Sequence, residues 1–468
     1  MRRYLVLVLA IALSAPIAHA TCGGGGGGGT GGMMPQTMDG GRRPDGYFVS
    51  WRTLKAGDAP LTTPMVLYWF PSSSDDTTYG GMVNSRILMI ASTRCVGMQL
   101  VRPDDAATAA KFDVAGKQPV ALLIGEEGKL LGRVDNEKSI LRASAVENMV
   151  NHEFYLRDTA LDAQVDEAKK KADSGDKDGA IAAYQKVWEQ RCIGPKQGRN
   201  AQKALKKLGV VVKDASLRGS DPVMTAAMNQ RMSEAMSRAF AAELAEDYAK
   251  ARELYRAAAA IDPADPVPMR FLGELYRHHT GEWKLAEATF VKLLSMQPDP
   301  LSRAVALHGL GKMTIHMGDS AKGLALFEQS IAAYPLALTY RNMAVYWNSE
   351  RRRDLADGYV KKALELNPTD GYNLIFAATY LADSGHADEA LRIAQKNEGV
   401  LSASYNLAAI YALIGDKGKA MEMLHRHFYQ YERYDAVRAK EMWEARVDYV
   451  FATIKDDADF VKLTAMAN

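Results

Sequence analysis

Hydrophobic and polar positions follow two different patterns along the chain, and the change between them lies near residue 155. Before it, short apolar runs alternate with stretches of helical spacing. The predicted elements are strands at 65–70, 95–101, 120–124 and 129–134, and helices at 82–92, 106–112 and 140–154. This order predicts a small α/β domain over residues 46–155, with a parallel core and an antiparallel edge.

From residue 161 onward the apolar spacing is helical throughout, and prolines recur at 263, 298, 335 and 368. The gaps of 35, 37 and 33 residues between these prolines indicate a helical repeat. We count seven units, one at 161–192 and six at 232–432. Residues 193–231 read as a basic helical linker, and 433–468 as the capping helices that the end of a solenoid requires. The fold class is therefore mainly α.

The repeat resembles the tetratricopeptide repeat, a helix-turn-helix unit of about 34 residues. Small residues match that family's alanine in the second helix: Ala251, Ala286, Gly323, Ala356, Ala390 and Ala420. Large residues follow at the expected offset: Tyr255, Phe290, Phe327 and Val360. Glycines mark the turns at 281, 318, 385 and 415, with N-cap candidates at Asp247, Asp319 and Asp416. The resemblance implies a concave groove that binds a protein or peptide partner.

The same resemblance implies candidate partner-binding residues on the first helix of two units. In that family an asparagine on this helix often bonds the ligand backbone, and Asn342 and Asn406 fall at the matching place. Arg341 and Tyr405 directly precede them and are included as candidates. The alternative, that all four are ordinary helix positions, stays open at this point.

The α/β region resembles the thioredoxin fold through the segment GKQPVALLIGEEGKLLGRV, residues 116–134. Pro119, just before a strand, corresponds to that family's cis-proline. The family's redox dithiol would follow the first core strand, but residues 71–76 read PSSSDD and contain no cysteine. Because serine cannot exchange disulfides, the resemblance implies a redox-inactive domain, and we expect this loop to cap a helix.

The N-terminus has the three-part pattern of a secretory signal peptide over residues 1–20: Arg2 and Arg3, an apolar core, and Ala18-His19-Ala20. Residues 21–45 are rich in glycine and read as a flexible tether. We expect an exported protein, periplasmic or secreted. Cys22 is a candidate for lipidation, which would make the protein an envelope lipoprotein instead. No later stretch has the length of a membrane helix, so none is expected in the mature chain.

Three cysteines and a net charge of +2 limit the chemistry. Cys95 and Cys192 could pair, but we favour two buried free thiols, since no close cysteine motif exists. No metal site, cofactor motif or catalytic constellation is predicted, and the near-neutral charge argues against a nucleic-acid partner. The basic segment 193–213 could meet an anionic lipid, a nucleic acid or an acidic protein, although a solvated linker is the preferred interpretation.

Two functional hypotheses follow from these patterns. The preferred one is an exported, non-enzymatic scaffold that binds a protein or peptide in the groove, with a non-catalytic thioredoxin-like module. The alternative is an exported thiol-redox protein that acts through Cys95. A third hypothesis, an enzyme with an active site between the two domains, is not supported by any residues that we could identify.

Overall fold

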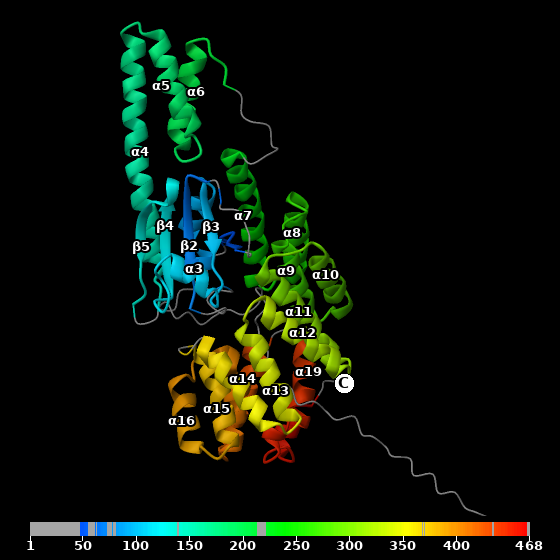
Figure 1. The fold of residues 1–468 in the computed structure, drawn as a ribbon. Helices are drawn as coiled ribbons and strands as arrows, with labels where there is room; N and C mark the ends of the chain where they lie inside the picture. Colours follow the sequence, from blue (N-terminus) through cyan, green and yellow to red (C-terminus); the bar gives the residue numbers. More distant parts are fainter. Residues whose placement is uncertain are drawn as a thin grey trace, which may run out of the picture.

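The computed structural model describes residues 47–54, 61, 63–72, 77, 81–137, 140–212, 221–366, 368, 370–432 and 435–465. The predicted signal peptide, the glycine-rich tether and Cys22 lie outside the described residues, as do residues 73–76 of the serine-aspartate loop and Lys213. A five-stranded sheet stands beside a long array of helices (Figure 1).

The sheet has the strand order β1-β3-β2-β4-β5. Its strands are β1 (Arg52–Thr53), β2 (Met65–Phe70), β3 (Val96–Leu100), β4 (Val120–Gly125) and β5 (Leu130–Val134). β1, β3 and β2 run parallel, whereas β4 and β5 are antiparallel to their neighbours. The predicted parallel core and antiparallel edge are therefore present. The peptide bond between Gln118 and Pro119, just before β4, is cis.

Alternation along β2 sends its side chains to two separate cores. Leu67 and Trp69 pack with α2 (Arg86–Ser92) and α4 (Ala143–Asp173), whereas Phe70 packs with α3 (Ala106–Lys111) on the opposite face. The predicted helix 82–92 is divided into α1 (Gly81–Asn84) and α2. Ser85 causes the break, because its extended backbone and its hydroxyl cap the N-terminus of α2 through Leu88 N–H at 3.0 Å.

One 31-residue helix, α4, runs through the predicted boundary between residues 155 and 161. No proline or glycine stands between Ala143 and Asp173 to end it. Its first half covers the sheet, and its second half packs with α5 (Lys177–Glu189) and α6 (Pro195–Lys207). These three helices form a projection beyond the sheet (Figure 1).

Within the described residues, the helical repeat consists of six helix pairs in which each helix packs on the next. The first helices, which we call the inner helices, are α7 (Pro222–Leu244), α9 (Val267–Glu274), α11 (Pro300–His316), α13 (Ala337–Ser349), α15 (Gly371–Asp383) and α17 (Ser404–Leu413). Their partners are α8 (Tyr248–Ile261), α10 (Trp283–Ser295), α12 (Ser320–Ala333), α14 (Arg353–Leu366), α16 (Ala387–Lys396) and α18 (Lys417–Arg426).

The residues that suggested the repeat have the structural roles expected of them. The small residues of the second helices are buried, and so are the large residues that follow them. The turn glycines 281, 318, 385 and 415 all have positive φ, which glycine adopts without a Cβ penalty. Asp247, Asp319 and Asp416 each cap a second helix by accepting a backbone N–H three residues on.

Short helical turns and two further helices complete the described chain. The turns are η2 (Glu126–Gly128), η3 (Leu275–His279), η4 (Leu401–Ala403), η5 (His427–Tyr431) and η6 (Tyr449–Phe451). After the repeat come α19 (Asp435–Val447) and α20 (Ala458–Leu463), in the region predicted to cap the solenoid. In the described part of the chain, none of the helices combines the length and apolarity that crossing a membrane demands.

Candidate partner-binding site

We call the surface formed by the inner helices the inner surface. The sheet packs against its first half, on α7, α9 and α11. Phe48, just before β1, meets Phe271 of α9 edge-on at 5.4 Å between ring centroids. Its backbone N–H donates to Ser237 Oγ of α7 at 2.8 Å. Leu301 and Val305 of α11 share a hydrophobic core with the sheet. The chain itself therefore covers these three inner helices.

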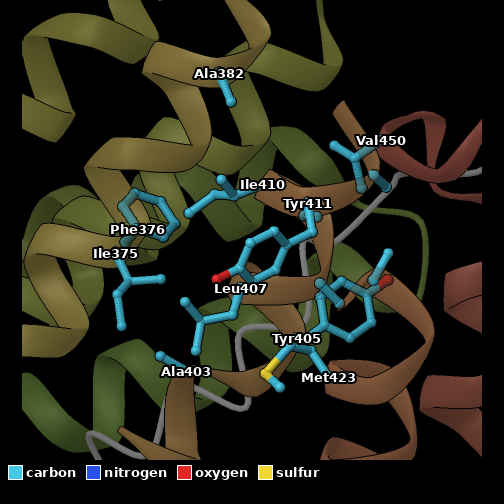
Figure 2. Close-up of a cluster of buried hydrophobic side chains, with 14 of the residues drawn as sticks. Ile375, Phe376, Ala382, Ala403, Tyr405, Leu407, Ile410, Tyr411, Met423 and Val450 are labelled. Atoms are coloured by element: carbon cyan, nitrogen blue, oxygen red, sulfur yellow. The ribbon is translucent and has the colours of Figure 1, made fainter. Parts of the chain in front are cut away.

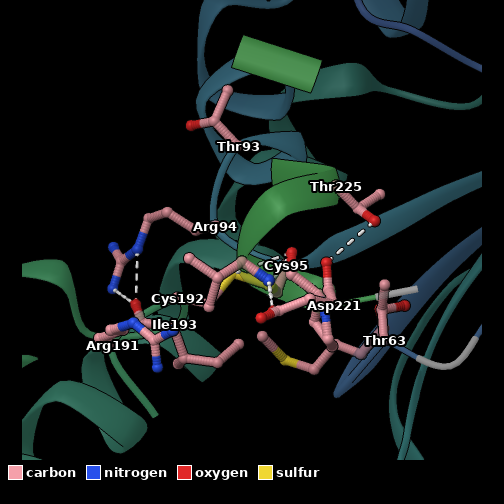
Figure 3. The surroundings of a disulfide bond; sticks show 12 residues. Thr63, Thr93, Arg94, Cys95, Arg191, Cys192, Ile193, Asp221 and Thr225 are labelled. Atoms are coloured by element: carbon pink, nitrogen blue, oxygen red, sulfur yellow. Dashed lines mark hydrogen bonds between the residues drawn. A yellow bond between two sulfur atoms is a disulfide. The ribbon is translucent and has the colours of Figure 1, made fainter. Parts of the chain in front are cut away.

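A disulfide fixes the same region, which corrects the preference for free thiols. Cys95 and Cys192 are bonded, with their Cα atoms 5.7 Å apart (Figure 3). Arg94 Nε donates to the Ile193 carbonyl oxygen at 2.8 Å, and its guanidinium pairs with Asp158 of α4 at 2.9 Å. Sequence reasoning could name this pair but not favour it, because the cysteines are 97 positions apart and meet only when the sheet docks on α4–α6.

The disulfide also bears on the thiol-redox alternative. Cys95 is 2% exposed and Cys192 8% exposed, and both sulfur atoms are held in the bond between them. Neither is therefore a free thiolate, which is the nucleophile that disulfide exchange needs. The carbonyl oxygen of Pro222, the first residue of α7, lies 3.0 Å from Cys95 Sγ, so the bond sits where the sheet, α4–α6 and the repeat meet.

Arg341 and Asn406 belong to one polar group on the second half of the inner surface. The Arg341 guanidinium of α13 lies 4.6 Å from the ring centroid of Tyr372 and donates to Asn373 Oδ1, both on α15. Asn406 of α17 donates from Nδ2 to the Tyr372 hydroxyl at 3.3 Å. We call these four residues the inner polar cluster. It joins three successive repeat units through guanidinium, amide and phenol groups.

The cluster is largely shielded from solvent. Arg341 is 6% exposed and Asn406 1% exposed. Asn406 Oδ1 has no hydrogen-bond partner in the described part of the chain. A buried amide oxygen without a partner is unusual, because the lost hydration is not replaced.

The other two candidates lie apart from the cluster. Asn342 is half-buried and donates from Nδ2 to the Leu338 carbonyl oxygen of its own helix at 3.1 Å. Tyr405 is fully buried among apolar side chains that include Leu407 and Met423 (Figure 2). Its hydroxyl donates to Asp448 Oδ2 at 3.2 Å, so Tyr405 faces the C-terminal segment. Whether any of the four binds a partner stays a prediction.

Two buried acidic groups at the C-terminal end of the described chain have raised pKa values. Burial, with Glu444 and Asp383 nearby, raises the pKa of Asp448 to about 7, while hydrogen bonds from Val450 N–H and Tyr405 oppose the rise. Burial and the neighbouring Glu441 raise the pKa of Glu432 to about 9, although the positive charges of Arg438 and Lys312 lower it. His427 Nε2 lies 2.6 Å from Glu441 Oε2. Within the described residues, no group of His, Cys, Asp and Glu side chains has the arrangement of a metal site.

Sequence reasoning missed Tyr372 and Asn373, which hold the cluster together. The signal was present, because the segment Gly371-Tyr372-Asn373-Leu374 resembles Ser404-Tyr405-Asn406-Leu407 one unit later. The two asparagines nevertheless sit differently, since Asn373 accepts from Arg341 whereas Asn406 donates to a tyrosine. The contact of Phe48 with the repeat had no comparable signal in the sequence.

Comparisons with known proteins give partial matches. No protein-family profile matches the chain. Over 135 residues, which are 27% of this chain and 24% of the relative, it is 31% identical to anaphase-promoting complex subunit 6 of Arabidopsis thaliana. The chain thus spans about a quarter of the length of that relative.

Two solved structures with similar helical regions are tetratricopeptide repeat proteins. YrrB, described as having an unusual peptide-binding site, is 24% identical over 41% of this chain and 99% of its own, with a TM-score of 0.26. A repeat protein from Parabacteroides merdae is 19% identical over 50% of this chain and 99% of its own, with a TM-score of 0.31.

Proposed function

We propose that this protein is an exported scaffold that binds a protein or peptide through its tetratricopeptide-like repeat, without enzymatic activity. The inner polar cluster is the observation that carries this proposal. It places Arg341, Tyr372, Asn373 and Asn406 on three successive inner helices, beyond the part covered by the sheet. Amide and guanidinium groups in a row across repeat units suit the backbone of an extended or helical segment.

The unpaired Asn406 Oδ1 gives the partner a specific contact in this proposal. A donor from the partner's backbone would satisfy an oxygen that the chain leaves without a partner, which favours binding at this place. Because the cluster is shielded, the partner reaches it after a local rearrangement of the half-buried side chains beside it, of which Asn342 is one.

Export is part of the same proposal. The pattern of residues 1–20 is the first support, with Thr21 as the expected first residue of the mature chain. The Cys95–Cys192 disulfide is a second, since such bonds persist in oxidising compartments. Mass spectrometry of the mature N-terminus tests both alternatives: a chain that starts at Thr21, or a lipid-modified chain that starts at Cys22.

For the sheet domain we propose a thioredoxin-like fold that has lost its redox role. Parallel β1-β3-β2, antiparallel β4 and β5, helices on both faces and the cis bond before Pro119 support this assignment. The segment after β2 has no cysteine, and Cys95 is held in its disulfide. We expect no insulin-reductase activity. Robust activity that is lost in Cys95→Ser would favour the thiol-redox alternative instead.

Site-specific photo-crosslinking tests the binding function directly. A photoreactive amino acid replaces Asn342, which lies beside Arg341 on inner helix α13. The matched control replaces Lys361 on the partner helix α14, whose side chain is 78% exposed. We expect a discrete adduct in intact cells from position 342 and none from position 361. Equal adducts from both positions, or none from either, would contradict binding on the inner surface.

A further inference from the structure

Helix α6 carries a row of five cationic side chains along one face. Lys196, Arg199, Lys203, Lys206 and Lys207 are all exposed. At 100° per residue these positions fall within one sector of about 100°. Ala201 and Leu205 lie on the opposite face, where they are fully buried against α4 and α5. We call the five cations the basic row.

The basic row lacks carboxylate partners among the residues that the structure describes. Residues 193–212 contain no aspartate or glutamate. Within the described part of the chain, none of the five cations forms an ion pair with a carboxylate. Asp162 of α4 accepts a hydrogen bond from Gln197 of α6 at 3.0 Å. Neither Asp162 nor the exposed Asp166 and Asp178 forms an ion pair with the row in the described part of the chain. Five unpaired like charges on 12 residues repel one another, so an anionic partner would relieve that repulsion.

The basic row lies on a part of the molecule that a partner surface can reach. Helices α4, α5 and α6 project beyond the sheet, away from the repeat (Figure 1). Just after the helix, Val211 is 77% exposed, more than any other large hydrophobic side chain among the described residues. Because the apolar face of α6 is buried, its contact with a membrane would be electrostatic, through cations that attract anionic headgroups, and the exposed aliphatic side chain of Val211 would add apolar contact.

We propose that the basic row and Val211 dock the α4–α6 projection onto an anionic lipid surface. Four of the five cations are lysines, which act as point charges toward phosphate groups and need no fixed geometry. Helix α6 has no aromatic side chain on which a base could stack, so single-stranded nucleic acid is the weaker fit. This role is separate from partner binding on the inner helices.

Vesicle sedimentation of the full chain tests the proposal. We expect binding to phosphatidylcholine vesicles that contain phosphatidylglycerol, little binding to phosphatidylcholine alone, and weakening with salt. At about fivefold per lysine, Lys203→Gln with Lys206→Gln should weaken binding about 25-fold. The matched control, Lys284→Gln with Lys361→Gln, removes the same charge from exposed positions on α10 and α14 and should leave binding unchanged.

Further arms separate the sources of binding. The apolar residues near position 10 could bind vesicles themselves, but they are the same in every variant. Differences in vesicle binding between the variants therefore come from α6. Val211→Ser should weaken vesicle binding several-fold while sparing its salt dependence. Equal loss in both double variants would overturn the proposal. So would tighter binding to a DNA or RNA oligonucleotide than to vesicles, or full competition by soluble glycerol phosphate, which would indicate a site for the headgroup alone.

Discussion

At the scale of single residues, Asp448 shows how the C-terminal segment is held. Asp448 is 3% exposed, and its carboxyl group accepts from the Tyr405 hydroxyl of α17. Burial is the main cause of its raised pKa, and the like charges of Glu444 on α19 and Asp383 on α15 add to that effect. A carboxyl group in this setting favours its protonated form, which explains a pKa of about 7.

The raised pKa predicts that Asp448 lowers stability as the pH rises. The folded chain binds this proton more tightly than the unfolded chain, whose aspartate titrates near pH ~4. Stability from this group is therefore complete below pH ~4 and is lost as the pH approaches about 7. In urea unfolding across this range, the free energy of unfolding should fall more steeply for the parent than for Asp448→Asn, by up to about 1.4 kcal/mol per pH unit.

Comparing the parent with Asp448→Asn isolates the proton of Asp448 from those of other buried groups. Glu432, with its raised pKa, adds a fall of the same sign in parent and variant alike, so the difference between the two belongs to Asp448. At about pH 8, Asp448→Asn should be the more stable protein. The control Asp166→Asn changes an exposed carboxylate of α4 and should leave the curve unaltered. Parallel curves for Asp448→Asn and the parent would show that Asp448 ionises normally.

At the scale of helices, Gly323 decides how closely α11 and α12 approach. A Cβ at this position would lie 2.3 Å from Ile315 Cγ1 and 2.9 Å from the Gly311 carbonyl oxygen. The backbone oxygen cannot move away as a side chain would. Glycine therefore stands here where the equivalent positions of other pairs hold alanine, such as Ala286 and Ala356.

Two glycine-to-alanine changes should thus have opposite effects. Gly323→Ala should lower the free energy of unfolding by about 1–3 kcal/mol, because it forces the two helices apart. Gly358→Ala on α14 meets nothing within 4 Å and should raise it by about 0.5–1 kcal/mol through helix propensity. Denaturant unfolding of both variants measures the contrast. A stabilised Gly323→Ala would mean that the helices separate without cost.

The same scale shows what the sequence could predict. Small residues, turn glycines and capping aspartates are local signals, so the helix pairs from Asp247 to Asp416 follow from them. Strand positions such as 65–70 follow from apolar runs with turns beside them. The length of α4 was misjudged at residues 155–161, although no helix-ending residue stands there.

Contacts between elements that lie far apart in the sequence could not be predicted from local patterns. The inner polar cluster joins Arg341 and Asn406 through Tyr372 and Asn373, and this depends on how three inner helices pack. Sequence position placed Asn342 and Tyr405 beside them, but side chains next to each other along a helix point about 100° apart. Only two of the four candidates therefore meet.

At the scale of the whole molecule, one joint connects the sheet, the α4–α6 projection and the repeat. The Cys95–Cys192 disulfide, the Arg94 contacts to Ile193 and Asp158, and the approach of Pro222 all lie there. Phe48 adds a second attachment between the sheet and the repeat. The orientation of the projection that carries the basic row is thus fixed relative to the inner surface.

Removing the disulfide should loosen this joint. The bond closes a loop of 97 residues, and its constraint on the unfolded chain is worth about 4–5 kcal/mol. Cys95→Ala with Cys192→Ala should therefore unfold at lower urea than the oxidised parent. Dithiothreitol should lower the midpoint of the parent and leave that of the double variant unchanged. Thiol labelling of the unfolded, unreduced full chain should find one free cysteine, Cys22, of the three present. If three thiols are labelled and dithiothreitol leaves the urea midpoint of the parent unchanged, the sheet is held by packing and hydrogen bonds alone.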